Sequence, residues 1–442
     1  MASDMKPMNV ALLGLGTVGK GTWNVLRRNQ EEIARRAGRS IRITWIAERA
    51  IDIAREATKG VEGVNISADA NEVLERPDVD IVVELIGGLE PARTFILKAI
   101  ANGKHVVTAN KALLAHHGNE IFAAAHAKGV TVAFEAAVAG GIPIIKALRE
   151  GLTANRIEWI AGIINGTSNF ILSEMREKGA SFADVLKQAQ ALGYAEADPT
   201  FDIEGIDAAH KLTIMSAIAF GVPMQFKKAY TEGITRLTKE DIRYAEELGY
   251  RIKLLGITRR APEGIELRVH PTLIPSRRLI ANVEGVMNAV LVKGDAVGAT
   301  LYYGAGAGAE PTASAVIADL VDVTRMHTSD PERRVPHLAF QPDQISDIPV
   351  LPMGEVRTSY YLRLRVLDQP GVLADITRIL ADRDISIDAM IQKEPPEGED
   401  QTDIILLTHL TIEKNVDAAI TAIEALPTVR GQVVRIRLEG LN

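Results

Sequence analysis

A group of carboxylates and one lysine stands at the start of a long apolar segment. Glu196 and Asp198 lie in a loop that ends at Pro199, and Asp207 and Lys211 follow. The last two are four residues apart, so both side chains project from one face of a helix. Carboxylates can hold an ammonium group, and a lysine can donate a proton. We therefore expect a site that binds an amine and moves a proton, with the Glu196 loop folding back towards that face.

The residues around this pair indicate burial. The segment from Ile206 to Phe220 is apolar nearly all round, as expected of a core helix. An Asp–Lys pair at this spacing is also common on solvated helices, where it stabilises by only a few tenths of a kcal/mol. On a buried helix a charge pair is costly unless other polar groups satisfy it, and such pairs are often functional. We favour the functional interpretation.

The composition limits the classes of protein that the chain can belong to. It has 442 residues, 47% of them hydrophobic, which suggests two or three globular domains. A net charge of −7 argues against a general nucleic-acid-binding protein. The absence of cysteine excludes thiolate catalysis, and His116 and His117 have no partners at zinc spacing. Without a signal peptide or a membrane-length apolar run, we expect a cytoplasmic protein with no membrane partner.

A glycine-rich turn follows the first apolar strand, Val10–Leu13. It reads Gly14-Leu15-Gly16-Thr17-Val18-Gly19 and opens a helix predicted over 18–37. In this context of strand, turn and helix, the first glycine permits the turn, the second admits a pyrophosphate and the third lets the helix pack closely. Free N–H groups at the helix start favour phosphate. The N-terminal third is therefore predicted to be a Rossmann domain.

The next predicted strand, 41–47, ends in Glu48 and Arg49. Rossmann folds contact the adenosine ribose at this position, where an acidic residue binds the 2′-hydroxyl of NAD and an arginine suits the 2′-phosphate of NADP. We expect Arg49 to face the phosphate while Glu48 turns away. This favours NADP and leaves NAD as the alternative.

Strands and helices alternate up to residue 135 and predict a doubly wound parallel sheet. Strands are expected over 79–85, 105–108 and 130–134, and helices over 91–102 and 118–128. Ligands bind at the carboxyl ends of such strands, and Lys111 follows one of them. We favour a lysine that polarises a carbonyl or holds a phosphate over a plain solvated loop lysine.

A second α/β block begins after Glu135 and contains small, glycine-rich segments. Strands are predicted over 157–164, 252–258, 265–271 and 288–293, with helices after the polar turn 165–170 and after Ser181. Gly304–Gly308 precedes an apolar helix that reaches about Val323. That glycine run is either a flexible loop or a second backbone approach to the cofactor, on a helix that packs back on the first domain.

The last fifth of the chain has the pattern βαββαβ, which suits a ferredoxin-like fold. A proline-rich linker is expected before it. The expected domains are a Rossmann domain over 1–135, a substrate-binding and dimerisation domain over 136–325, a linker over 326–357 and the ferredoxin-like domain over 358–442.

Taken together, these segments resemble homoserine dehydrogenases of the long bacterial type over nearly the whole chain. The shared motifs are Gly14–Gly19, Thr108-Ala-Asn-Lys111-Ala, Glu135–Pro143, Gly166-Thr-Ser-Asn-Phe170, Leu192–Pro199 and Asp207-Ala-Ala-His-Lys211. The resemblance implies an oxidoreductase acting on a CH–OH group, which interconverts L-aspartate 4-semialdehyde and L-homoserine with NAD(P). This reaction belongs to the biosynthesis of threonine, methionine and isoleucine.

The resemblance also implies roles for individual residues. Lys211 would donate the proton, with Lys111 and Asp207 as the other catalytic residues. The substrate would be bound by Glu196, Asp207, Gly166 and Thr167. To the cofactor contacts expected from the sequence itself, at Gly14, Leu15, Gly16, Thr17, Val18, Gly19 and Arg49, the resemblance adds Lys111, Gly193 and Gly308. A monovalent cation such as Na⁺ would bind at Glu135, Val138, Gly140 and Ile142, largely through main-chain oxygens.

The C-terminal domain resembles an ACT domain, and the turn Asp368-Gln-Pro-Gly-Val-Leu373 carries the likeness. ACT domains pair through their sheets and bind amino acids, which implies an effector site at Asp368, Gly371, Val372 and Leu373 and L-threonine as the effector. The alternative is an ACT domain that only dimerises. We expect a homodimer or homotetramer, and we expect a chain cut at about residue 355 to stay active but to ignore threonine.

Two other functions compete with this one. A phosphoglycerate dehydrogenase also joins Rossmann and ACT domains, but it needs a second Rossmann-like lobe and a catalytic histidine, which we do not find. A nucleotide-binding amino-acid sensor without catalysis would leave Lys111, Glu196, Asp207 and Lys211 without a purpose. Oxidation of L-homoserine with NAD and NADP in parallel separates the three.

Overall fold

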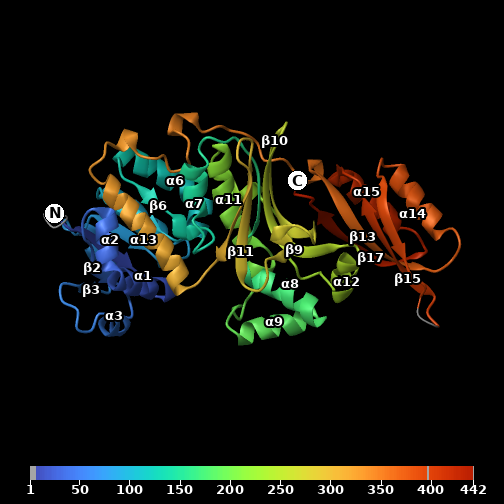
Figure 1. Cartoon of the computed structure of the whole chain (residues 1–442), viewed down its shortest axis with the longest axis horizontal. Coiled ribbons are helices and arrows are strands. Elements are labelled where there is room, and N and C mark those ends of the chain that lie inside the picture. Colours follow the sequence, from blue (N-terminus) through green and yellow to red (C-terminus); the bar gives the residue numbers. More distant parts are fainter. Residues whose placement is uncertain (1–5, 396–397, 442) are drawn as a thin grey trace. The chain divides into compact units, whose positions relative to one another are not determined.

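The computed structural model describes residues 6–395 and 398–441 and divides the chain into two compact units (Figure 1). The first unit contains the described residues up to Gly166, together with Asp207–Lys227 and Met287–Ile348. The second contains Thr167–Ile206, Lys228–Val286 and the described residues from Pro349 onward. The chain therefore passes several times from one unit to the other.

A six-stranded parallel sheet forms the base of the first unit, in the order β3-β2-β1-β4-β5-β6. Its strands are β1 Met8–Leu13, β2 Ile41–Ala47, β3 Asn65–Ser67, β4 Ile81–Glu84, β5 His105–Thr108 and β6 Val132–Ala133. The strand order reverses between β1 and β4, which makes the carboxyl ends of these two strands the expected place for a dinucleotide. The predicted doubly wound sheet is confirmed.

The helices of this sheet differ from the prediction at two places. They are α1 Thr17–Arg28, α2 Gln30–Ala37, α3 Ile51–Ala57, α4 Ala70–Glu75, α5 Ala92–Ala101 and α6 Lys111–Lys128. The single helix predicted over 18–37 is broken at Asn29, a residue type that favours helix ends over helix interiors. Helix α6 begins at Lys111 instead of Gly118, because the Asn110 side chain accepts a hydrogen bond from Leu113 N and caps it.

Helix α13, Ala309–Met326, completes the core of this sheet from a distant part of the chain (Figure 1). Its residues Val316 and Leu320 belong to the same buried cluster as Val10 and Leu12 of β1. The helix also approaches α1 closely, since a Cβ added at Gly21 would lie 2.3 Å from the carbonyl oxygen of Ala309. The start of α13, and with it the loop that precedes α13, therefore lies against α1, the helix that follows the glycine-rich turn.

The rest of the first unit consists of an antiparallel three-stranded sheet and a buried helix. The strands are β7 Ile157–Ile163, β11 Met287–Gly294 and β12 Gly298–Ala305, and the helix is α11 Ile206–Phe220, preceded along the chain by the short α7 Ile144–Lys146. Strand β12 was not predicted, and it includes Gly304, so the glycine-rich loop is limited to Gly306–Gly308.

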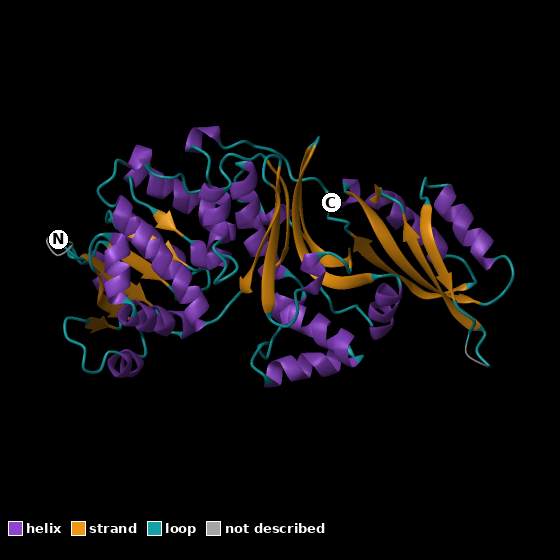
Figure 2. Ribbon diagram, viewed as in Figure 1, coloured by secondary structure: helices purple, strands orange, loops and turns teal. Residues whose placement is uncertain are grey.

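The second unit carries a long hairpin and several helices (Figure 2). The hairpin is β9 Tyr250–Ala261 with β10 Gly264–Pro275, and the short β8 Tyr230–Thr231 pairs with β10. The helices are α8 Gly166–Lys178, α9 Phe182–Ala191, α10 Thr200–Ile203 and α12 Lys239–Glu247. The helix predicted after Ser181 is α9, and the Ser181 side chain caps it by accepting a hydrogen bond from Asp184 N.

The C-terminal part of the second unit has the predicted βαββαβ order. It comprises β13 Arg357–Leu367, α14 Val372–Ala381, β14 Ile387–Gln392, β15 Gln401–Thr408, β16 Thr411–Ile412, α15 Glu413–Glu424 and β17 Val429–Leu438. The sheet order β17-β13-β15-β14 is that of a ferredoxin-like fold.

This C-terminal sheet is continuous with the hairpin of the same unit. Strand β17 pairs in parallel with β10, through Thr272 opposite Arg437 and Leu273 opposite Leu438. Arg437 is fully buried, and its guanidinium donates to Glu413 and, at 2.8 Å, to Glu232 after β8. Main-chain contacts therefore join the C-terminal domain to the hairpin, and a side-chain contact joins it to the segment after β8.

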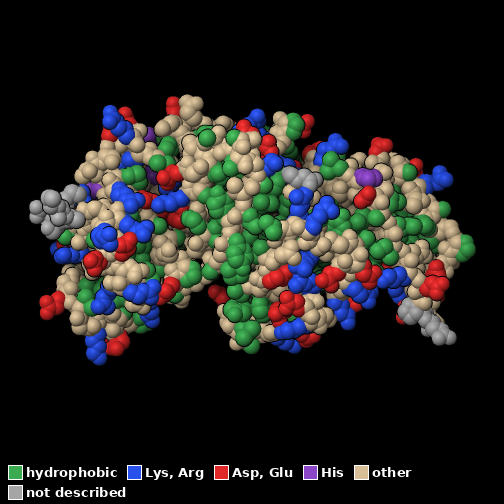
Figure 3. Space-filling model, viewed as in Figure 1, with side chains coloured by type: hydrophobic (Ala, Val, Ile, Leu, Met, Phe, Trp, Pro, Cys, Tyr) green, Lys and Arg blue, Asp and Glu red, His purple; other side chains and the backbone are tan. Residues whose placement is uncertain are grey.

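The surface of the first unit's helices carries charges of both signs close together (Figure 3). On α2, for example, Glu32 pairs with Arg35 at 3.1 Å and with Arg36 at 2.9 Å. Across the described residues, no helix combines the length and the apolar character needed to cross a membrane.

Candidate active site

Three polar side chains of the first unit meet at the carboxylate of Asp207, in the first turn of α11. Lys211 Nζ donates to Asp207 Oδ2 at 2.7 Å and to the carbonyl oxygen of Ile164 at 2.7 Å. Asn165 Nδ2 donates to the same Oδ2 at 2.9 Å, and Lys111 Nζ lies 3.1 Å from Oδ1. The three residues predicted to be catalytic are thus in direct contact.

Three different elements deliver these side chains. Lys111 is the first residue of α6, immediately beyond the carboxyl end of β5, and Asn165 follows the end of β7. Asp207 and Lys211 are one turn apart on α11. Sequence reasoning placed Asn165 in a polar turn without giving it a role, although its place after a buried strand was a usable signal.

Asp207 carries its negative charge in spite of its burial. Burial alone would raise its pKa, but the charges of Lys211 and Lys111 and the hydrogen bonds from Lys211 and Asn165 outweigh that effect and hold the pKa well below its usual range. The Lys211 side chain is 11% exposed and that of Lys111 is 33% exposed. Lys111 therefore has the greater access from outside.

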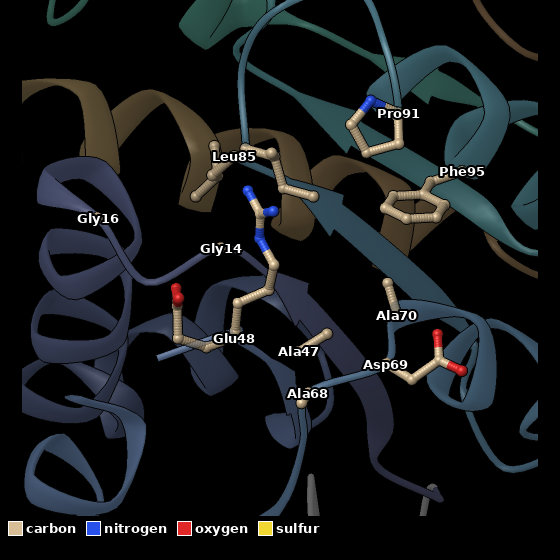
Figure 4. Close-up of a pocket in the computed structure, with 12 residues that line it drawn as sticks. Gly14, Gly16, Ala47, Glu48, Ala68, Asp69, Ala70, Leu85, Pro91 and Phe95 are labelled. Carbon is tan, nitrogen blue, oxygen red and sulfur yellow. The ribbon is translucent and has the colours of Figure 1, made fainter. Parts of the chain in front are cut away.

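A pocket of about 300 Å³ opens beside the glycine-rich turn (Figure 4). Gly14 has a φ of 91°, and a Cβ added at Gly19 would lie 2.3 Å from the carbonyl oxygen of Gly14, so both positions require glycine. A Cβ at Gly16, in contrast, would meet no heavy atom within 4 Å. Open space above Gly16 at the start of α1 fits the approach of a dinucleotide's pyrophosphate. Leu15 is buried beneath the turn, and Thr17 and Val18 begin α1.

Glu48 and Arg49 occupy different positions at this pocket. Glu48 Oε2 accepts a hydrogen bond from Leu15 N at 2.8 Å and Oε1 accepts one from Ala50 N at 3.0 Å, so the carboxylate braces the glycine turn. Figure 4 shows this carboxylate pointing towards the turn, with Pro91 and Phe95 on the opposite wall. Arg49 is exposed and lines the same pocket.

The predicted substrate residues are divided between the units. Gly166 ends a segment of the first unit, whereas Thr167, Gly193 and Glu196 belong to the second. Within the second unit, Thr167 Oγ1 donates to the carbonyl oxygen of Tyr194 at 2.6 Å, which ties the start of α8 to the loop that carries Gly193 and Glu196. The approach of Glu196 to Asp207 stays a prediction.

The predicted cation residues lie on an irregular buried segment of the first unit. The Glu135 carboxylate accepts hydrogen bonds from Ile145 N at 2.9 Å and Lys146 N at 2.8 Å, and burial raises its pKa. Within the parts of the chain that the structure describes, no three His, Asp or Glu side chains are grouped to hold a metal ion. The monovalent-cation site at this segment stays a prediction.

Tight turns shape this segment. The Val138 N–H donates to the carbonyl oxygen of Glu135 at 3.3 Å, and the carbonyl oxygen of Ile142 accepts from Ile144 N at 2.8 Å. Gly140 has a φ of 49°, and a Cβ there would lie 2.5 Å from the carbonyl oxygen of Gly306, in the loop that ends at Gly308. The predicted cation segment and the predicted second cofactor loop are therefore adjacent.

The predicted effector turn lies between β13 and α14. Gly371 has a φ of 95° and precedes α14. Val372 is buried in the core of the C-terminal domain, and Leu373 packs against that core. Asp368 is exposed, and its N–H donates to the carbonyl oxygen of Asp400 at 2.9 Å.

Comparison with known proteins identifies each of these regions. Residues 14–135 match the family model of the homoserine dehydrogenase NAD-binding domain, residues 143–321 match that of homoserine dehydrogenase, and residues 360–428 match that of the ACT domain. The chain is 66% identical to a homoserine dehydrogenase of Pseudomonas aeruginosa, over 99% of this chain and 100% of that protein.

Solved structures agree with this. A crystal structure of a homoserine dehydrogenase from Thiobacillus denitrificans is 75% identical, with a TM-score of 0.94 over 99% of both chains. A hyperthermophilic archaeal homoserine dehydrogenase in complex with NADPH is 27% identical, with a TM-score of 0.62 over 72% of this chain and 98% of the other. The predicted resemblance is confirmed: the chain belongs to the homoserine dehydrogenase family, oxidoreductases that act on a CH–OH group, and it carries a C-terminal ACT domain.

Proposed function

We propose that the chain interconverts L-homoserine and L-aspartate 4-semialdehyde with NADP at the cluster of Lys111, Asp207 and Lys211. The observation that carries this proposal is one buried carboxylate shared by two lysine ammonium groups. A structural ion pair needs only one cation, whereas a reaction that creates negative charge on an oxygen benefits from a second.

The chemistry of the reaction fits this geometry. The nicotinamide supplies or accepts the hydride when it is bound. Reduction of the aldehyde develops negative charge on its oxygen, which the Lys211 ammonium stabilises before it donates a proton. Lys111, at the more exposed edge of the cluster, assists by holding positive charge beside the same oxygen. Asp207 holds both ammonium groups in place, because its two oxygens contact Lys111 and Lys211.

Asp207 can also take part in binding the substrate's amino group. Its two oxygens already face Lys111, Lys211 and Asn165, and an ionised carboxylate offers about four acceptor positions. One position therefore remains for the substrate's ammonium group, with Glu196 as the second anion. This division of labour leaves Asn165 to orient the carboxylate.

Two observations support NADP over NAD. Both oxygens of Glu48 accept main-chain hydrogen bonds, so this acid already has partners other than a ribose hydroxyl. Arg49 lines the pocket beside it and offers a positive charge to a 2′-phosphate. The archaeal relative bound to NADPH is consistent with this choice.

The remaining roles are proposed on the family resemblance. A monovalent cation would bind the main-chain oxygens near Glu135, Val138, Gly140 and Ile142, and would fix the segment beside Gly306–Gly308. L-Threonine would bind the turn at Asp368 and Gly371 and inhibit the enzyme. The chain would form a homodimer or homotetramer through the proposed substrate-binding and dimerisation domain.

One assay tests the proposed activity. Purified enzyme is mixed with L-homoserine and either NADP or NAD, and formation of the reduced cofactor is followed by its absorbance. We expect turnover with both substrates present and a higher kcat/KM with NADP. Absence of homoserine-dependent reduction of either cofactor would refute the proposal.

A further inference from the structure

A cluster of three aromatic rings lies next to the charged cluster of Lys111, Asp207 and Lys211. His210, on α11 between Asp207 and Lys211, is 2% exposed. Its ring centroid is 5.3 Å from that of His116, at an interplanar angle of 69°, and 4.3 Å from that of Phe226. His116 and Phe226 are 4.7 Å apart, so His116, His210 and Phe226 form a closed ring cluster.

The ring cluster joins the two helices that carry the lysines. Helix α6 begins with Lys111 and carries His116 five residues later, about 7.5 Å along its axis. Helix α11 carries His210 directly beside Lys211. The two helices therefore meet twice, once through the ion pair of Lys111 with Asp207 and once through the rings.

These two contacts differ in stiffness. Long lysine side chains tolerate small shifts of the backbone, because their rotatable bonds allow the ammonium group to follow its partner. Aromatic rings packed edge to face have little such freedom. The rings therefore fix the distance between α6 and α11 more sharply than the ion pair does.

We propose that His116 and His210 are positioning residues, whose ring contact sets the spacing of α6 and α11 and so aligns the Lys111 and Lys211 ammonium groups for the reaction. This inference rests on the proposed roles of the two lysines. Neither histidine has to touch the substrate or the cofactor.

The surroundings of the two histidines favour neutral rings. The charged and titratable groups that act on His210 are Asp207 and Lys211 on its own helix and Lys111 and His116 on α6. Burial, followed by the charge of His116, lowers the pKa of His210 to about 4. Burial, His117 and Lys227 likewise lower the pKa of His116. A phenylalanine at either position keeps an aromatic ring without the imidazole nitrogens, and so tests whether the ring alone sets the spacing.

Three variants of the full-length chain test this. His210→Ala removes the contact and His210→Phe keeps a ring. His126→Ala is the matched control, since His126 is an exposed histidine on α6 outside the ring cluster. For each variant kcat, the KM for NADP and for L-homoserine, and the melting temperature are measured. Lys211→Ala is assayed in parallel.

We expect His210→Ala to lower kcat about 10- to 100-fold, because displacement of a catalytic group by about 1 Å can cost that much. Its KM for NADP should stay within about twofold, and His210→Phe should recover most of kcat. Normal kcat in His210→Ala, or a loss that His210→Phe does not recover although that variant is folded, overturns the inference.

The parallel variant separates this inference from the proposed function. If Lys211→Ala turns over normally, the proposed role of that lysine fails. If Lys211→Ala is inactive while His210→Ala is normal, only the positioning role fails. Should His210→Ala not fold, His210→Phe still decides, since a folded His210→Phe with a large loss of kcat contradicts the spacer role.

Discussion

At the scale of single residues, Asp207 determines the state of the cluster. It is the shared partner of Lys111, Lys211 and Asn165, and together with the two lysines it forms the predicted catalytic set. Its contact with Lys211 followed from their spacing on one helix. Its contacts with Lys111 and Asn165 depend on how three distant segments pack, which no local pattern encodes.

Removal of this carboxylate should affect both activity and folding. In Asp207→Asn, two ammonium groups lose their counter-charge, and breaking a buried pair is costly. We expect kcat to fall at least about 100-fold and the free energy of unfolding to fall by about 3 kcal/mol. Steady-state kinetics and urea unfolding measure the two effects, with exposed Asp52→Asn as control. Full stability together with full activity would contradict this view of the cluster.

Lys211 should matter for turnover more than for binding. Lys211→Ala removes the proposed proton donor, so kcat should drop about 10²- to 10⁴-fold, while the dissociation constant for homoserine stays near the original value. Single-turnover kinetics together with equilibrium binding separate the two quantities. Near-normal turnover in this variant would assign proton donation elsewhere, with Lys111 as the next candidate.

Arg49 should set the choice of cofactor. Arg49→Ala removes the charge proposed for the 2′-phosphate, so kcat/KM with NADP should fall about 10-fold or more while kcat/KM with NAD changes little. The ratio of the two specificity constants is the measurement. An unchanged ratio would mean that another group at the pocket recognises the phosphate.

At the scale of elements, most strands and helices were predictable, because the spacing of their hydrophobic residues and the capping residues at helix ends are visible in the sequence. Strand β12 was missed because Gly298 and Gly304 give it low β-propensity, and pairing with β11 makes it a strand. Helix α12 was overlooked although Thr238 and Asp241 form a capping box that the sequence contains. The early start of α6 matters most, since it places Lys111 at a helix start rather than in a loop.

His337 anchors the proline-rich segment to the first unit. Its Nε2 accepts a hydrogen bond from Val132 N at 3.0 Å, and its ring stacks on Phe122. Burial, with Arg149 nearby, lowers its pKa to about 3 in the folded state. Since its unfolded pKa is about 6.5, the unfolded chain binds the proton more tightly. The stability this residue contributes is thus present above pH 6.5 and is lost as pH falls towards 3.

A substitution can isolate this contribution. His337→Phe keeps the stacking but leaves Val132 N without its acceptor, so we expect a loss of about 1 to 3 kcal/mol in the free energy of unfolding at pH 7. The difference from the original chain should shrink as pH is lowered to 5 and then to 4. Urea unfolding at each pH measures it, and a difference that is constant with pH would contradict the assigned protonation.

At the scale of the whole molecule, the expectation for a truncated enzyme needs revision. The ACT domain was predicted to be removable at about residue 355, but β17 pairs with β10 and Arg437 bonds to Glu232. Asp241 on α12 accepts from Tyr361 and Arg363 of β13, and Arg268 on β10 pairs with Glu439 at 2.5 Å. Sequence motifs correctly identified the homoserine dehydrogenase and ACT domains, but they carried no information about the contacts between β10, α12 and the ACT domain.

A chain ending at residue 355 should therefore be unstable. It would expose an unpaired strand edge at β10 and would remove the partners that the C-terminal domain supplies to Glu232, Asp241 and Arg268. We expect aggregation or loss of activity, measured by size-exclusion chromatography and homoserine oxidation. A monodisperse, fully active truncated enzyme would contradict this.

Regulation is better tested in the full chain, by comparing inhibition by L-threonine in Asp368→Ala and in the original protein.

The parallel pairing of β10 with β17 also bears on how such an enzyme could acquire a new regulator. A sensor domain taken from another protein would need a last strand that pairs with the edge of β10. Near the end of that strand it would need an arginine that reaches Glu232. A graft designed from sequence boundaries alone would leave β10 without its neighbouring strand and Glu232 without the arginine that pairs with it. Exchange of the sensing module is thus tied to joint change in the hairpin that receives it.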